Sequence, residues 1–75
     1  RADLRGAVLR GAFLQGARFT GAVLAGTDFR RADLAAAELR GVRFRDADLR
    51  GANLENADLR DADLRNARID AGTRW

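Results

Sequence analysis

The side chains of this sequence that could do chemistry are carboxylates and guanidiniums. Asp58, Asp61 and Asp63 form a close group of acids, an arrangement that suits a metal ion or an acid–base pair. The chain has no histidine, cysteine, lysine, serine or tyrosine, so it lacks the common nucleophiles, bases and soft metal ligands. We therefore predict no enzyme activity, no metal site, no cofactor and no small-molecule substrate.

An acid is followed two positions later by arginine repeatedly along the chain. Five of these pairs are Asp28/Arg30, Glu38/Arg40, Asp48/Arg50, Asp58/Arg60 and Asp63/Arg65. Residues two apart in an extended segment share a face, so each pair can neutralise itself and form an ordinary solvated surface. The sharper alternative is a basic stripe of Arg10, Arg30, Arg31 and Arg50 that binds nucleic-acid phosphates weakly. The net charge of only +3 makes nucleic acid an unexpected partner.

These charged residues are spaced by a five-residue repeat. A large apolar residue recurs at every fifth position, and a small residue, usually alanine, stands two positions before it. The large residues are Leu4, Leu9, Leu14, Phe19, Leu24, Phe29, Leu34, Leu39, Phe44, Leu49, Leu54, Leu59, Leu64 and Ile69. An α-helix would spread this series around its axis, and a straight strand would alternate its faces. A short extended piece followed by a bend buries the whole series, which is the predicted core.

The bend falls two positions after each large residue. Glycine, asparagine or aspartate occupies most of these positions, and these residues tolerate left-handed backbone. Arg31, Ala36 and Ala71 are exceptions, so we expect that not every bend requires positive φ.

Units such as Ala-Asp-Leu-Arg-Gly at 2–6 and Ala-Asn-Leu-Glu-Asn at 52–56 resemble the pentapeptide-repeat family, whose pattern is A-(D/N)-L-X-X. The resemblance covers residues 2–69. It implies an all-β fold, a right-handed quadrilateral β-helix with 20 residues per coil, here about 3.5–4 coils. We place the solenoid at 1–71 and assign 72–75 to a C-terminal cap or to the start of a further segment. Position 74, the next in the series, is Arg74, so the repeat is expected to end after Ile69, with Gly72 and Trp75 as the cap.

Function is expected on the outward positions. Val8, Phe13 and Val23 are apolar there, which indicates contact with a preceding segment, a protein partner or a second copy. Some members of the family that the chain resembles imitate duplex DNA and modulate DNA gyrase, a type II topoisomerase. That role requires an acidic rod, so it is the alternative, and a non-catalytic structural or protein-interaction module is preferred.

The setting is predicted from composition alone. The chain has no cysteine and no apolar run long enough to span a membrane, and its arginine- and alanine-rich composition is common in bacteria. We expect a cytoplasmic bacterial module that is a piece of something longer.

Overall fold

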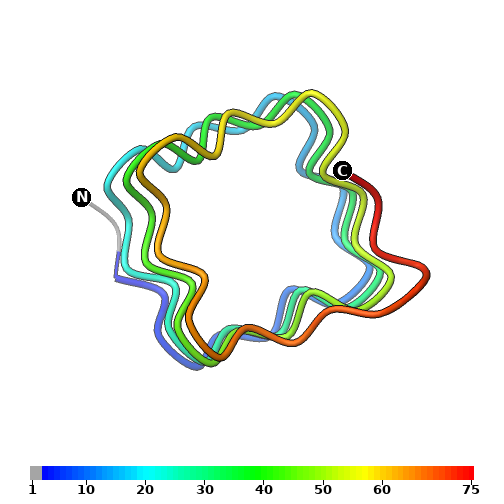
Figure 1. The fold of residues 1–75 in the computed structure, drawn as a ribbon, viewed down its shortest axis with the longest axis horizontal. Helices are drawn as coiled ribbons and strands as arrows, with labels where there is room; N and C mark the ends of the chain where they lie inside the picture. The colour runs from blue at the N-terminus through cyan, green and yellow to red at the C-terminus, as the bar shows by residue number, and fades with distance from the viewer. Residues whose placement is uncertain (1–2) are drawn as a thin grey trace.

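Parallel backbone bridges between residues 20 apart organise the chain. Asp28 pairs with Asp48 and Asp33 pairs with Asn53, and such a bridge occurs every five residues. The computed structural model describes residues 3–75. Their coils stack with four sides each, seen end-on in Figure 1. The resulting body measures 28 × 21 × 19 Å. The resemblance to the pentapeptide-repeat family is thus confirmed in its fold, the right-handed quadrilateral β-helix.

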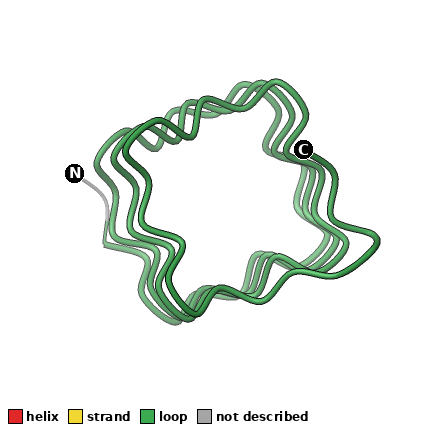
Figure 2. Cartoon of the chain, viewed as in Figure 1, coloured by secondary structure: helices red, strands yellow, loops and turns green. Residues whose placement is uncertain are grey.

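No helix or extended strand forms within residues 3–75, as Figure 2 shows. Each side of a coil is one short extended piece that touches its neighbours through single bridges. The unit 32–36 illustrates the pattern. The Leu34 N–H donates to the Asn53 carbonyl of the next coil at 2.8 Å, and the Ala37 N–H closes a turn onto the Leu34 carbonyl at 3.0 Å. A turn in every unit explains the period of five.

The third residue of these turns has positive φ, as a type II turn requires. The expectation that not every bend requires positive φ holds at Ala71, which is not among the positive-φ residues, and is wrong at Arg31 and Ala36, whose φ values are 60° and 58°. The cause is the lattice of the coil. The Arg31 N–H donates to the Arg50 carbonyl at 3.0 Å and the Ala36 N–H to the Glu55 carbonyl at 2.9 Å, so the following coil holds each bend in place.

We number the four faces in chain order, and each collects one unit from every coil. Face 1 comprises 3–6, 22–26, 42–46 and 62–66; face 2 comprises 7–11, 27–31, 47–51 and 67–71; face 3 comprises 12–16, 32–36, 52–56 and 73–75; face 4 comprises 17–21, 37–41 and 57–61. A residue therefore has its stacking neighbour one coil away on the same face.

The interior holds the predicted large residues. Leu24, Phe29, Leu34, Leu39, Phe44, Leu49 and Leu54 are buried, and Leu4, Leu9, Leu14, Phe19, Leu59 and Leu64 are partly buried against them. Ile69 contradicts its prediction as a core residue, because 53% of its surface is exposed. A residue one coil further on in the face 2 ladder would be needed to cover it, and residues 73–75 lie on face 3 instead. Burial is therefore complete only where a coil lies on both sides.

The last corner contains one residue more than the others. Arg74 pairs with Asn53 across 21 positions, so Arg74 points outward and does not continue the inward series. Thr73 fills the small inward position, and its hydroxyl donates to the Leu49 carbonyl at 2.9 Å. An Asp70 carboxylate oxygen accepts from the N–H groups of Gly72 and Gly51, at 2.9 and 3.0 Å, and so holds the wider turn. This corner protrudes in Figure 1, coloured red.

No helix among residues 3–75 has the length and apolar character needed to cross a membrane.

Candidate interaction surface

Three positions of each unit face outward: those immediately before and after the large residue, and the bend. Charged side chains at these positions are spread over ribbed faces. Among residues 3–75, no group of three or more acids lies close enough to hold a metal ion. Asp58, Asp61 and Asp63 do not converge, because Asp58 belongs to face 4 and Asp63 to face 1, with Asp61 at the corner between them.

The predicted basic stripe is an ion-paired ladder on face 2. Arg10 and Arg30 both reach the Asp28 carboxylate at 2.9 Å, and Arg50 reaches Asp48 at 2.6 Å. A longer contact of 3.7 Å joins Arg30 to Asp48 and connects the steps of the ladder. The hydrogen bond from Arg30, with a further one from Arg10, holds the pKa of Asp28 well below its ordinary value. Three arginines of the stripe therefore share two aspartates, and Arg31 is exposed at the corner beside them.

Four of the five predicted acid–arginine pairs form, at distances of 2.6 to 2.9 Å. The fifth is wrong: Glu38 contacts Arg18 of the preceding coil at 3.3 Å, and not Arg40. The reason is the length of the acid. Each paired aspartate also accepts the backbone N–H two residues on, as Asp58 does from Arg60 at 3.2 Å. This Asx turn fixes the shorter carboxylate beside its own unit, whereas glutamate is one methylene too long for it.

The three apolar residues predicted as an interface lie on three different faces. Phe13 on face 3 is 84% exposed, and Val8 on face 2 is 70% exposed. Both belong to the first described coil, on neighbouring sides. Val23 lies on face 1 in the second coil, bridged to Asp3 and Arg43, and is half-buried. The structure thus places Val8 and Phe13 in one coil and Val23 apart from them.

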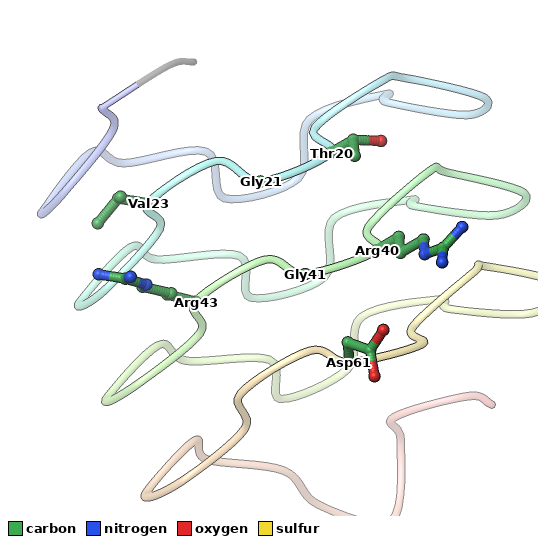
Figure 3. A pocket seen from close by; sticks show the side chains of 7 residues that line it. All are labelled: Thr20, Gly21, Val23, Arg40, Gly41, Arg43 and Asp61. Atoms are coloured by element: carbon green, nitrogen blue, oxygen red, sulfur yellow. The ribbon is translucent and has the colours of Figure 1, made fainter.

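Two adjoining grooves open beside Val23. The first, of about 490 Å³, lies at the corner of faces 4 and 1 and is lined by Gly21 and Gly41. Figure 3 shows the Arg40 and Arg43 side chains extending on either side of this corner. The second groove, of about 440 Å³, runs across face 1 and shares Val23 and Arg43 with the first. Together they form one continuous concave surface.

The groove arginines were missed at the sequence level, although a signal for them was present. Arg40, Arg43 and Arg45 form no ion pair with any carboxylate of residues 3–75. Position 43 holds arginine where most units hold an acid or asparagine, so Arg45 has no partner two residues before it. Arg40 is left free because Glu38 pairs with Arg18.

The fold and its repeat match known proteins. The family model described as pentapeptide repeats matches residues 1–35 and 37–70. None of the curated proteins compared with the chain matches it.

Three solved structures are similar to the chain. A pentapeptide repeat protein from the Arabidopsis thaliana thylakoid lumen is 28% identical with a TM-score of 0.58, over 96% of this chain and 52% of that protein. QnrB1, a plasmid-mediated fluoroquinolone resistance protein, is 27% identical with a TM-score of 0.72, over 92% and 36%. A pentapeptide repeat protein from Nostoc is 31% identical with a TM-score of 0.53, over 97% and 69%. The chain therefore spans about half of the Arabidopsis protein and little more than a third of QnrB1. The chain belongs to the pentapeptide repeat family.

Proposed function

We propose that this chain is a non-catalytic pentapeptide-repeat module that binds another protein surface through Phe13 on its first coil. The exposure of Phe13 carries the proposal. The next two coils have Asp33 and Asn53 in the same column, so a phenylalanine there serves neither the core nor the turn. Aromatic side chains dominate protein interfaces because they bury a large apolar area, about 150–250 Å² each.

Val8 supports the same contact. It lies one face away in the same coil, where the following coils carry Asp28 and Asp48. A partner that covers the corner between faces 2 and 3 at this coil would bury both Phe13 and Val8. The outward charges of the ladder on face 2, Arg10, Asp28, Arg30, Asp48 and Arg50, are engaged with each other.

Self-association is the form of this contact that can be tested with the chain alone. We expect multi-angle light scattering to give a mass above the 8.2 kDa monomer that rises with concentration. Phe13→Asp and Phe13→Asn should both return the mass to the monomer, and both should fold because the column already carries Asp33 and Asn53. The asparagine variant removes the ring without adding charge. An equal mass for wild type and both variants at every concentration would refute self-association through Phe13.

A second candidate, modulation of DNA gyrase by imitation of DNA, is favoured by the similarity to QnrB1. Charge argues against it. Face 3 has Asp33 and Glu55 as its only acids, offset in part by Arg74, whereas duplex DNA carries about one charge per 1.7 Å. A gyrase supercoiling assay separates the two candidates: the mimic should inhibit at micromolar concentration, and the interaction module should leave supercoiling unchanged.

The proposed setting is the bacterial cytoplasm. The absence of cysteine supports a reducing compartment as the place where this module works.

A further inference from the structure

We propose that the groove on face 1 binds an extended, acidic segment of a protein partner, with Arg43 and Arg45 as its anchors. The inference rests on the proposed function as an interaction module. It adds a second surface, on a different face from Phe13, and the chemistry of what that surface binds.

The first support is a pair of arginines without ion-pair partners among residues 3–75, in a concave place. In the unit 42–46, arginines stand both before and after the buried Phe44, and neither contacts a carboxylate of the described residues. The two other arginine-bearing units of face 1, 3–6 and 62–66, differ from this one. Asp3 holds Arg5 and Asp63 holds Arg65, each at 2.7 Å. Arg43 and Arg45 are thus the free cations of face 1, and the second groove is lined by both.

The second support is spacing. Arg43 and Arg45 are two residues apart on one extended unit and face the same groove. Side chains on one face of an extended peptide also recur every two residues, about 6.8 Å apart. Two acids at alternate positions of such a segment can therefore meet the two guanidiniums together. Guanidinium and carboxylate are matched in shape for paired hydrogen bonds. Arg40 lies on the other side of the corner that contains Gly21 and Gly41. It adds a third cation, which a third acid of the bound segment can meet.

The third support is the apolar row beside the arginines. Val23 stacks directly on Arg43, and Ala25 lines the same groove. The outward position immediately before the large residue usually carries a polar residue in this chain. Val23 at this position gives the partner segment an apolar contact next to the acids that the arginines bind. The groove thus combines two kinds of recognition within one surface, as protein interfaces do.

The same groove is poorly suited to nucleic acid. Asp61 lines the first groove, at the corner of faces 4 and 1, and Asp63 lines the second groove, on face 1. A phosphate backbone that ran along the groove would pass these carboxylates, whereas a short acidic peptide places its charges on the arginine row alone. Nucleic-acid binding also requires several uncompensated cations in series, and here the series has two on one face.

Fluorescence anisotropy tests the proposal with defined probes. The first probe is a labelled peptide of alternating glutamate and valine, the second is its glutamine counterpart, and the third is a short single-stranded DNA. We expect the glutamate peptide to bind the wild-type protein and the other two probes to bind more weakly. The double variant Arg43→Gln with Arg45→Gln should weaken peptide binding about fivefold or more, a factor typical of two exposed ion pairs.

Arg68→Gln is the matched control. Arg68 also precedes the large residue of its unit, is exposed, and has no ion pair among the described residues, but it lies on face 2. Its variant should bind the peptide as the wild type does. The proposal is overturned if the glutamate peptide does not bind, if Arg68→Gln weakens it as much as the double variant, or if the DNA binds more tightly. Light scattering tests the contact through Phe13, and the peptide assay tests the groove on face 1. The failure of one proposal is therefore distinguishable from the failure of the other.

Discussion

Leu49 gives the sharpest test of how the stacked coils are stabilised. It is fully buried, and its stacking neighbours on face 2 are Phe29 on one side and Ile69 on the other. Leu49→Ala removes three carbons, which is worth about 2.4 kcal/mol in transfer free energy alone. The cavity left between two coils raises the expected loss to about 2–5 kcal/mol. A chain of this size has a total stability of about 4–11 kcal/mol, so the variant should lose a large part of it.

The free energy of unfolding is measured by urea titration, followed by far-ultraviolet circular dichroism. Ile69→Ala is the matched control, because it removes the same number of carbons from the same ladder at a position that is 53% exposed. Its loss should stay below about 1 kcal/mol. Equal losses for the two variants would refute the reasoning that burial depends on having a coil on both sides.

Two further predictions concern charge and backbone strain. Hydrogen bonds from Arg60 and Arg65 lower the pKa values of Asp58 and Asp63 from 3.8 to about 2. Because the unfolded chain takes up these protons first, stability should be full above about pH 4 and fall between about pH 4 and pH 2, as the urea midpoint across this range will show. Ala36→Gly should raise the free energy of unfolding by about 0.5–1 kcal/mol, because it relieves a non-glycine residue at φ 58°. Ala35→Gly next to it should lower the free energy, and the same sign for both variants would contradict this account.

The period of five was enough to predict the coil and its interior. Each large residue has one inward direction, and only a chain that bends once per unit keeps Leu34 and Leu49 inside together. The four-sided form came from the resemblance and not from the spacing itself. The positive φ of Arg31 and Ala36 could not be read from their residue types, because neighbouring coils impose it through backbone hydrogen bonds.

The candidate surfaces were less predictable, since they depend on which partner each charge finds. The length of Glu38 moves its contact to Arg18 and leaves Arg40 free. Arg43 in the place of an acid was visible in the sequence, but its meaning required the groove beside it. The extra residue in the last corner was hidden because the series of large residues simply stops, while Thr73 takes over the inward position in a shifted register.

The central claim is that residues 20 apart lie side by side on neighbouring coils, and pairwise cysteine cross-linking tests it directly. The chain has no cysteine of its own. The double variant Asp33→Cys with Asn53→Cys places two thiols on bridged residues, where the spacing of adjacent chains, about 4.8 Å, suits a disulfide. Two control pairs combine Asp33→Cys with Asp48→Cys or with Asp58→Cys. Their thiols would lie side by side only if a coil held 15 or 25 residues, so neither pair should form a disulfide. We predict a disulfide in the first pair alone; fast closure of either control pair would contradict the four-sided coil.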